Sequence, residues 1–280
     1  MKIIENQNFQ QERALYALTN AKVNNCRFEG EEDGESPLKE TYDIQVNNSF
    51  FALRYPFWHN RNTTLNNVKM TELCRAALWY DQDVKINHSV LHGIKALREC
   101  QDIVINHSDI ISPEFGWFCN DLKINDTSLV GEYPFLHSSN MVLSNFKLQG
   151  KYSFQYVKDL IIRDSYLDTK DAFWHSQNVT VYDSVIKGEY LAWYSEGLKL
   201  VRCKIIGTQP LCYASNLILE DCEMVDTDLA FEYSEVNATI KGNIDSIKNP
   251  KTGKIVADHI GEVILDENIA HESDCEIITQ

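Results

Sequence analysis

The sequence lacks the features that mark several large functional classes. It has no run of about 18 apolar residues, which a membrane-spanning helix requires, and its first residues, MKIIENQNFQQER, lack the apolar core of a secretory signal. Basic residues are scarce: 26 Lys+Arg stand against 41 Asp+Glu, the formal charge is −15, and no basic cluster of the kind that binds phosphate is present. We therefore expect a cytoplasmic protein that binds neither nucleic acid nor a membrane surface.

Signatures of common catalytic and metal sites are also absent. The 8 cysteines contain no Cys-x-x-Cys pair, and there is no glycine-rich phosphate loop and no nucleophile elbow. His88, His107 and Asp126 are spaced nineteen residues apart, but residues that replace asparagine in a recurring turn explain them better than a metal site does. We expect no metal, no cofactor, and reduced thiols.

What the sequence does contain is a repeat of nineteen residues. Apolar residues recur at every nineteenth position from Val84 to Val236, and the columns that begin at Ile86 and Leu91 are apolar too. Apolar and polar residues alternate within each repeat, which is typical of β-strands. Stacked Asn and Asp side chains mark a turn between the first two strands. The pattern predicts an all-β fold, a single-stranded right-handed parallel β-helix (a β-solenoid) of about twelve coils of roughly nineteen residues.

The expected organisation is one domain over residues 1–280. Residues 1–20 form an N-terminal cap, in which QNFQQERALYAL indicates a short amphipathic helix, and residues 21–236 form the coils. Residues 237–280 form a C-terminal cap, because SIKNPKTGKIVAD resembles two strands joined by an Asn-Pro-Lys-Thr-Gly turn, a hairpin. Caps are expected because an open coil exposes unpaired strand edges.

The chain that closes each coil forms a third side, and its columns differ in chemistry. We count back from the first apolar residue of each repeat, which is Val84 or its counterpart. The sixth residue before it is mostly Leu or Phe, the fifth position holds all 5 tryptophans, and the fourth is mostly His, Tyr or Glu. Because strand side chains alternate, either the Leu/Phe column or the Trp column faces inward. Outward Trp would form a stacking surface for sugar rings or for another protein, whereas inward Trp would fill the core. The sequence leaves both alternatives open.

The candidate site residues come from the two outer columns, the segments beside them and the inserted loop GEEDGESPLKE. The binding candidates are Lys39, Glu40, Trp58, His59, Trp79, Arg98, Trp117, His137, Trp174, Trp193 and Tyr194. The candidates for acid, base or nucleophile are Glu99, Asp171, His175, Glu189, Asp228 and Glu232. Two carboxylates one coil apart lie closer together, and two carboxylates two coils apart lie farther apart, than most of the catalytic carboxylate pairs of glycoside hydrolases. A solvated charged rim is the simpler interpretation of the same carboxylates.

Long strings of the sequence resemble a known family. They are GESPLKE (34–40), VYDSVIKGEYLAW (181–193), PLCYASNL through TDLAFEYSEV (210–236) and IDSIKNPKTGKIVADHIGEVILDE (244–267). The chain, from about Glu12 to Glu267, resembles the bacterial domain-of-unknown-function family numbered thirty-seven thirty-seven, which is grouped with pectin-lyase-like right-handed β-helices. The resemblance implies that fold and supplies no activity.

Two functions remain open from the sequence. The first is binding of a carbohydrate-like ligand along the aromatic third side, where carboxylates and Arg98 orient hydroxyl groups, with action on the glycan as an extension. The second is a non-catalytic scaffold or self-associating protein, a homo-oligomer, that uses the aromatic face or the C-terminal hairpin. The sequence does not decide whether the protein is an enzyme.

Overall fold

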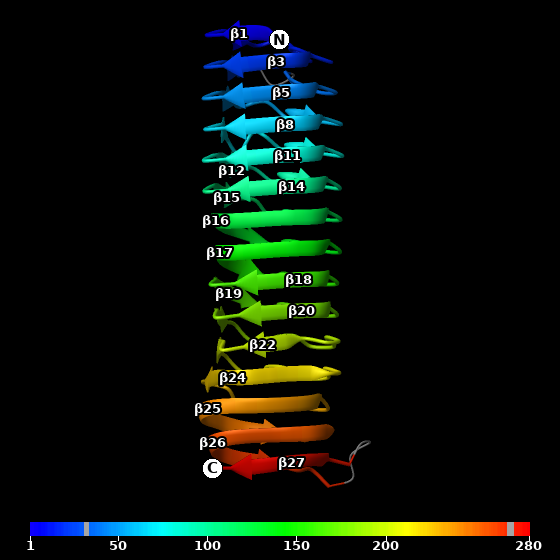
Figure 1. Cartoon of the computed structure of the whole chain (residues 1–280), viewed down its shortest axis with the longest axis vertical. Helices are drawn as coiled ribbons and strands as arrows, with labels where there is room; N and C mark the ends of the chain where they lie inside the picture. The colour runs from blue at the N-terminus through cyan, green and yellow to red at the C-terminus, as the bar shows by residue number, and fades with distance from the viewer. Residues whose placement is uncertain (31–33, 268–271) are drawn as a thin grey trace. The chain divides into compact units, whose positions relative to one another are not determined.

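The computed structural model describes residues 1–30, 34–267 and 272–280, which form strands and turns and contain no helix (Figure 1). The chain divides into two compact units, Met1–Val142 (the N-terminal unit) and Leu143–Gln280 (the C-terminal unit). Neighbouring strands pair in parallel, as in the pairing of Val84 with Ile103 and of Leu160 with Val179. The predicted parallel β-solenoid is therefore confirmed, with about 14 turns.

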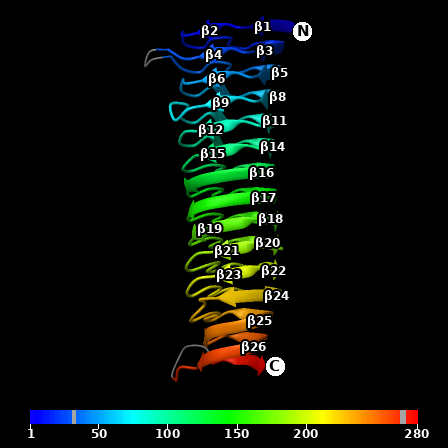
Figure 2. The same ribbon diagram turned by 90° about the vertical axis from the view of Figure 1, so that its left-hand side faces the viewer.

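In the N-terminal unit each turn contributes a first strand, a shorter second strand and, in three turns, a two-residue strand on the third side. The first strands are β1 (Lys2–Glu5), β3 (Thr19–Asn24), β5 (Tyr42–Asn47), β8 (Arg61–Asn66), β11 (Gln82–Asn87), β14 (Gln101–Asn106) and the longer β16 (Asn120–Glu132). The second strands are β2 (Asn8–Phe9), β4 (Arg27–Phe28), β6 (Phe50–Phe51), β9 (Lys69–Met70), β12 (Val90–His92) and β15 (Asp109–Ile111), and Figure 2 shows them beside the first strands. The third-side strands are β7 (Phe57–Trp58), β10 (Leu78–Trp79) and β13 (Leu97–Arg98).

The C-terminal unit has the same arrangement with longer final strands. After β17 (Ser139–Lys151), which begins before the division, the first strands are β18 (Lys158–Arg163), β20 (Gln177–Tyr182) and β22 (Lys199–Val201). The second strands are β19 (Tyr166–Lys170), β21 (Val185–Lys187) and β23 (Lys204–Ile206), and the last turns contain β24 (Leu217–Val225), β25 (Glu235–Lys248), β26 (Thr252–Ile264) and β27 (Asp274–Thr279).

The predicted apolar columns form the interior of the coil. Val84, Ile86 and Leu91 are each at most 1% exposed, as are their counterparts in most turns. In Figure 1 the first strands of each unit run from right to left at the front while each later turn lies lower, so the coil is right-handed, as predicted. Burial of these columns is the main source of stability, because apolar area removed from water contributes roughly 25 cal/mol per Å².

The turn after each first strand explains the columns of Asn and Asp. In the N-terminal unit the amide of Asn47 donates to Asn24 at 2.8 Å, and each later asparagine donates to the one a turn earlier up to Asn125. The next residue, such as Asn67 or His88, has a left-handed backbone with φ near 50°. Asn and Asp tolerate that conformation better than most residues do, which is why they recur there.

A buried polar column lies three residues before Val84 and its counterparts in the other turns. In the N-terminal unit the backbone N–H of Asn60 donates to Oδ1 of Asp81 at 2.7 Å, while Oδ2 of Asp81 has no hydrogen-bond partner. Asp81 is 1% exposed, and burial raises the pKa of its carboxyl well above the ordinary value. In the C-terminal unit Ser176 and Ser195 occupy the same position and carry no charge. This column therefore encloses a carboxyl group in the N-terminal unit, at Asp81.

The predicted N-terminal helix is wrong. Residues 3–18 contain β1, β2 and a series of turns, and β1 pairs with β3. Ile4 and Phe9 extend two of the buried columns into the first turn, where Ile4 pairs with Val23 and the ring of Phe9 stacks on Phe28 at 5.0 Å. These apolar residues stabilise a further coil, so no amphipathic helix face is left over.

The predicted C-terminal hairpin is also wrong, because β25 and β26 run parallel. Val236 pairs with Gly253 and Ala238 with Ile255, so the Asn-Pro-Lys-Thr-Gly segment is the corner of a shortened coil. Ile255 and Ala257 are buried in continuation of the inner columns. Asn, Pro and Gly occur both in hairpin turns and in solenoid corners. The burial of the inner columns on either side determines which of the two structures forms.

Candidate functional site

The third side resolves the question of which column faces inward. The Leu/Phe column is buried: Phe57, Leu78, Leu97 and Phe173 are 0% exposed. The Trp column lies outside the coil and is half-buried. Of the two alternatives left by the sequence, the structure shows the one with inward Leu and Phe.

The tryptophans brace neighbouring turns through their indole N–H groups. Nε1 of Trp58 donates to the carbonyl oxygen of Ala76 at 2.8 Å, and Trp117, Trp174 and Trp193 make equivalent bonds one turn on. Nε1 of Trp79 donates to Oε1 of Glu99 instead. These N–H groups are engaged within the protein, so the tryptophans serve as a rigid backing and do not offer free donors to a ligand.

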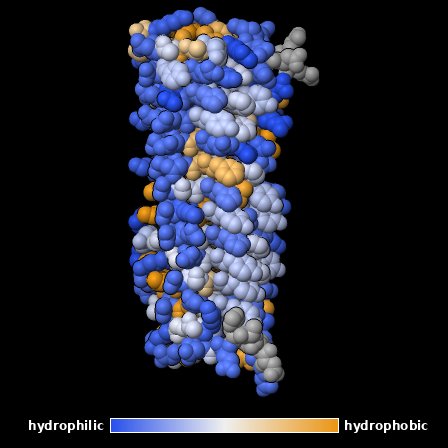
Figure 3. Space-filling model, turned by 90° about the vertical axis from the view of Figure 1, so that its right-hand side faces the viewer, coloured by the Kyte–Doolittle hydropathy of each residue, from blue (hydrophilic) through white to orange (hydrophobic). Residues whose placement is uncertain are grey.

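The outer column of the C-terminal unit is a continuous stack of four rings, here named the aromatic row: Tyr156, His175, Tyr194 and Tyr213. Successive ring centroids lie 4.9, 5.1 and 4.9 Å apart with nearly parallel planes. Tyr156 is 43% and Tyr194 47% exposed. Because the rings cover one another's faces, the exposed parts of Tyr156 and Tyr194 are their edges. Figure 3 shows large pale side chains, of intermediate hydropathy, gathered along the right-hand side of the face in view.

A second aromatic layer supports the aromatic row. The rings of Trp174 and Trp193 stack at 5.4 Å with an angle of 3° between their planes. Trp193 also meets the edges of Tyr190 and Tyr213 at 5.4 and 5.3 Å. The aromatic row is therefore fixed from behind by side chains that are themselves hydrogen-bonded.

The outer column of the N-terminal unit is interrupted. His59 stacks on Tyr80 at 5.0 Å and Phe118 stacks on His137 at 5.4 Å. Glu99 occupies the turn between these two pairs. This unit thus presents two separate ring pairs.

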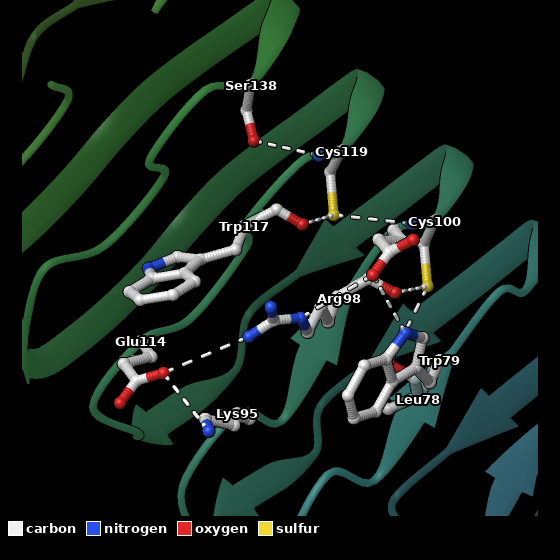
Figure 4. A network of polar contacts seen from close by, with 10 residues as sticks. Leu78, Trp79, Lys95, Arg98, Cys100, Glu114, Trp117, Cys119 and Ser138 are labelled. Carbon is white, nitrogen blue, oxygen red and sulfur yellow. Dashed lines mark hydrogen bonds and ion pairs between the residues drawn. The ribbon is translucent and has the colours of Figure 1, made fainter. Parts of the chain in front are cut away.

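Arg98 stands in the Trp column beside this interruption, and Figure 4 shows its surroundings. Its guanidinium carbon lies 5.0 Å from the ring centroid of Trp79 and 4.9 Å from that of Trp117. Nitrogen–oxygen distances to Glu99 and Glu114 are 3.6 and 3.9 Å, and the side chain is 17% exposed. The planar cation replaces a tryptophan between two aromatic faces, and the carboxylates balance its charge.

Asp171 is the candidate carboxylate with the most unusual environment. It is 5% exposed, and within the described residues its carboxylate makes no hydrogen bond or ion pair. Burial raises the pKa of the Asp171 carboxyl, the Lys170 ammonium offsets part of the rise, and Glu189 adds to it. Nζ of Lys170 lies 2.8 Å from Oε2 of Glu189, and the backbone N–H of Asp171 donates to the carbonyl oxygen of Glu189 at 2.9 Å, so Asp171 and Glu189 are neighbours in adjacent turns. His175, the candidate acid or base nearby in sequence, is part of the aromatic row.

The remaining carboxylate candidates lie farther along the C-terminal unit. Glu232 pairs with Nζ of Lys248 at 3.1 Å, and the hydroxyl of Tyr213 lies 3.5 Å from Oε2 of Glu232. Burial and the Glu232 carboxylate raise the pKa of Tyr213 to about 12. Asp228 is exposed. Glu232 therefore anchors one end of the aromatic row, and Asp228 does not join it.

Of the inserted loop, the structure describes Gly30 and residues 34–40, and residues 31–33 lie outside the described residues. Nζ of Lys39 lies 5.8 Å from the ring centroid of Trp58, and the hydroxyl of Tyr16 donates to Glu40 at 2.6 Å. Both candidates thus reach the third side of the N-terminal unit, as predicted, but each is engaged with a neighbouring side chain.

The described part of the third side holds no metal centre. Within the described ranges no group of three or more His, Cys, Asp or Glu side chains is arranged to hold a metal ion. The rings of His88 and His107 stack at 4.8 Å. A hollow of about 410 Å³ on the C-terminal unit is lined by Asp183, Arg202, Lys204 and others away from the aromatic row, and Arg202 and Asp183 neutralise each other there at 2.6 Å.

Tyr156 and Tyr213 belong to the aromatic row although the sequence did not single them out as binding residues. Both occupy the same repeat position as Tyr194, which was chosen. Membership of that column was the signal that could have found them, because residues at one repeat position share one orientation.

Comparisons with known proteins give a family and distant structural likenesses. The family described as "Protein of unknown function (DUF3737)" matches residues 2–278. Functionally curated proteins give no match. Similar solved structures include PfbA, a surface adhesin of Streptococcus pneumoniae (7% identity, 80% of this chain and 82% of that chain, TM-score 0.48). Another is the A-module of the Azotobacter vinelandii mannuronan C-5 epimerase AlgE4 (11% identity, 85% and 89%, TM-score 0.40). At these TM-scores the likenesses carry no functional argument.

No helix among the described residues is long and apolar enough to cross a membrane.

Proposed function

The chain belongs to the DUF3737 family, whose description assigns no activity, and we propose from the site itself that it binds a linear saccharide along the aromatic row of the C-terminal unit. The observation that carries the proposal is the stack of Tyr156, His175, Tyr194 and Tyr213 at 4.9–5.1 Å, with exposed edges. Rigid, exposed aromatic side chains with hydroxyl groups are typical of surfaces that bind ligands which are partly apolar and partly polar.

The geometry suits an extended ligand better than a compact one. Each turn presents one ring edge at nearly the same spacing, so a chain of sugar units lying along the row meets a similar surface at each step. Tyrosine hydroxyl groups donate and accept hydrogen bonds with sugar hydroxyls. Trp174 and Trp193 keep the row rigid, which lowers the entropy lost on binding.

The proposal concerns binding and not turnover. Glu99 lies beside Arg98, Glu189 is paired with Lys170 and Glu232 with Lys248. Paired carboxylates serve to fix neighbouring side chains and to orient hydroxyl groups of a ligand. A saccharide is thus the proposed partner, and no cofactor is part of the proposal.

Titration calorimetry with linear neutral hexose oligomers tests this function. Replacing Tyr156 or Tyr194 by Ala is expected to weaken binding by about three- to tenfold each. Tyr166 on β19 is a matched control, because it is 43% exposed like Tyr156 and lies outside the aromatic row. Tyr166→Ala should leave affinity unchanged. Absence of binding to every oligomer, or an equal loss in the control, would show the proposal to be wrong.

A second candidate is self-association through the aromatic face, supported by one observation in the N-terminal unit. Phe118 is 46% exposed and has no polar group with which to contact a sugar hydroxyl. Large exposed apolar side chains are common at protein interfaces. Sedimentation over a range of concentrations would reveal a dimer, and Phe118→Ser should abolish it. The version that used a C-terminal hairpin is excluded, since β25 and β26 are parallel.

We also propose a cytoplasmic location. Its support is that all eight cysteines are free thiols and seven of them are buried. Adjacent buried thiols would be exposed to oxidation during folding in an oxidising compartment. Fractionation of cells that express the protein tests this location directly.

A further inference from the structure

Two cysteines of the C-terminal unit stand side by side in adjacent turns. Cys203 and Cys222 are nineteen residues apart in the sequence. The strands beside them are in register, because Lys204 pairs with Glu223 and the backbone N–H of Glu223 donates to the carbonyl oxygen of Cys203 at 2.9 Å. Neighbouring strands of a sheet lie about 4.8 Å apart. That separation falls within the Cα–Cα range of roughly 4.4–6.8 Å that a disulfide spans.

The column that holds these two cysteines contains serine in the two preceding turns, at Ser165 and Ser184. The hydroxyl of Ser184 accepts from the backbone N–H of Ser165 at 3.0 Å and donates to the carbonyl oxygen of Tyr182 at 2.6 Å. The thiol of Cys203 makes the second of these bonds at 3.5 Å, to the carbonyl oxygen of Val201. A thiol is the weaker hydrogen-bonding group. The structural role of this position therefore does not require two successive thiols.

One of the two thiols borders the hollow of about 410 Å³ on the C-terminal unit. Cys203 is among the residues that line it, together with Arg202 and Lys204 on either side in the sequence. The side chains of Cys203 and Cys222 are otherwise buried, at 1% and 0% exposed. A small uncharged oxidant such as hydrogen peroxide can therefore approach Cys203 from the hollow, while larger reagents are kept away from both thiols.

The two thiols differ in acidity in the direction that an attacking and a resolving cysteine require. A hydrogen bond from the Cys222 thiol lowers the pKa of Cys203, and burial acts against this effect. The same contact raises the pKa of Cys222. Because the thiolate is the nucleophile in reactions with peroxides, Cys203 is the sulfur that reacts first and Cys222 the sulfur that reacts second.

We propose that Cys203 and Cys222 form a redox modification site, which hydroperoxides oxidise to a disulfide. The Cys203 thiolate attacks one oxygen of hydrogen peroxide, the O–O bond breaks, and a sulfenic acid and hydroxide form; the hydroxide takes up the proton that the thiol released and becomes water. The Cys222 thiol then attacks the sulfenic sulfur, and its proton leaves with the hydroxyl group as a second water. The two sulfurs lose two electrons in total, and the peroxide gains them.

The disulfide would join the two ends of one complete turn, residues 203–222, which carries Tyr213 of the aromatic row. A cross-link of this kind restricts the unfolded chain. The oxidised protein should therefore unfold at a midpoint roughly 5 °C higher than the reduced protein. Low-molecular-weight thiols should reverse the change, because they reduce disulfides by exchange. The inference does not depend on saccharide binding.

The N-terminal unit contains a matched pair of thiols, Cys100 and Cys119, which are also one turn apart (Figure 4). The backbone N–H of Cys100 donates to Sγ of Cys119 at 3.5 Å. Both cysteines belong to the enclosed column of Asp81, and burial raises the pKa of Cys100 well above its ordinary value. A protonated and enclosed thiol is unreactive, so this pair should stay reduced under the same treatment.

The test treats the folded protein with millimolar hydrogen peroxide, then denatures it, alkylates the remaining thiols and maps the peptides by mass spectrometry. The peptides of Cys203 and Cys222 should lose alkylation together and appear as one cross-linked species, which dithiothreitol separates. Cys203→Ser should leave Cys222 fully alkylated, and serine suits this position as it does at Ser184. Cys119→Ser is the control, and it should leave the cross-link unchanged.

Three outcomes would overturn the inference. The first is full alkylation of both cysteines after peroxide treatment, and the second is oxidation of Cys203 to a sulfinic acid without a cross-link. The third is a disulfide between Cys100 and Cys119 that forms equally fast, which would mean that stacking alone is sufficient and that the hollow has no role. Because the cross-link is measured in the unaltered protein, a folding defect in a variant does not prevent a decision.

Discussion

The outer column of the third side is continuous in the C-terminal unit and interrupted in the N-terminal unit. Four rings stack in succession from Tyr156 to Tyr213, whereas Glu99 separates two ring pairs in the other unit. The backbone is the same in both cases, with φ of 49° at Glu99 and 59° at Tyr194. The repeat thus determines where a side chain points, and the residue type determines whether that position contributes a ring or a charge.

The interruption is compensated one column away. Arg98 inserts a flat cation between Trp79 and Trp117, where the C-terminal unit stacks Trp174 directly on Trp193. Planar groups therefore continue to stack in both units. In the N-terminal unit, however, the stack carries charge and is tied to Glu99 and Glu114.

The largest expected loss of stability comes from removing a buried ring that lies beneath the aromatic row. Phe173 is fully buried and stacks on Phe154 at 4.9 Å beneath the row. Phe173→Ala should lower the free energy of unfolding by about 3–5 kcal/mol, because it leaves a cavity. Tyr194→Ala, at the surface of the same turn, should cost less than about 1 kcal/mol. Urea denaturation compares the two, and equal losses would mean that the row contributes to the core.

An intermediate change in the free energy of unfolding is expected on replacing Asp81, the enclosed carboxyl of the N-terminal unit. Because its pKa is raised in the folded protein, folding takes up a proton at pH values between the unfolded and folded pKa. Its contribution is therefore most favourable below about pH 4 and is lost as the pH rises toward the folded-state pKa. Asp81→Asn should raise the free energy of unfolding at pH 7 by about 1–3 kcal/mol, with no gain at pH 3.

The control for Asp81 is Asp83→Asn, since Asp83 is exposed two residues away. It should change stability little at either pH. A gain at pH 7 that persists undiminished at pH 3 would contradict the assignment of the effect to ionisation of Asp81.

The smallest expected change in stability tests whether the Arg98 guanidinium stacks in the place of a tryptophan ring. Arg98→Met should lower the free energy of unfolding by about 1 kcal/mol, because three cation–π contacts are lost while the apolar packing is kept. Gln155 holds the same column position in the C-terminal unit and makes only a long bond of 3.5 Å to the carbonyl of Asp171. Gln155→Met should be nearly neutral. Thermal unfolding that ranks the two variants in the opposite order would refute this role of Arg98.

The sequence predicts the interior of the first two strands because the repeat is strict. Val84 and Ile86 and their counterparts are buried as expected, whereas the sequence left open whether the Leu/Phe column or the Trp column of the third side faces inward. The ends were not predicted. Ile4 and Phe9 suit a helix face as well as a first coil, and Asn249 and Pro250 suit a hairpin turn as well as a corner. Short segments do not determine their pairing partners, and the adjoining buried columns do.

The site was predicted in position but not in detail. Column membership placed Trp174, Trp193 and Tyr194 together, and spacing placed Asp171 beside Glu189. Ring orientation could not be derived, because it depends on side-chain torsions and on hydrogen bonds such as that from Trp193 to the carbonyl of Gln209.

The asparagine ladder of the N-terminal unit has a direction. Every side-chain amide from Asn47 to Asn125 donates toward the N-terminus, so the amide dipoles add along the axis as peptide dipoles do in an α-helix. The last donor, Nδ2 of Asn24, meets the carboxylate of Glu5 at 3.0 Å. Glu5 is therefore placed like an acidic N-cap: an anion lies at the positive end of an aligned array, built here from side chains of a β protein.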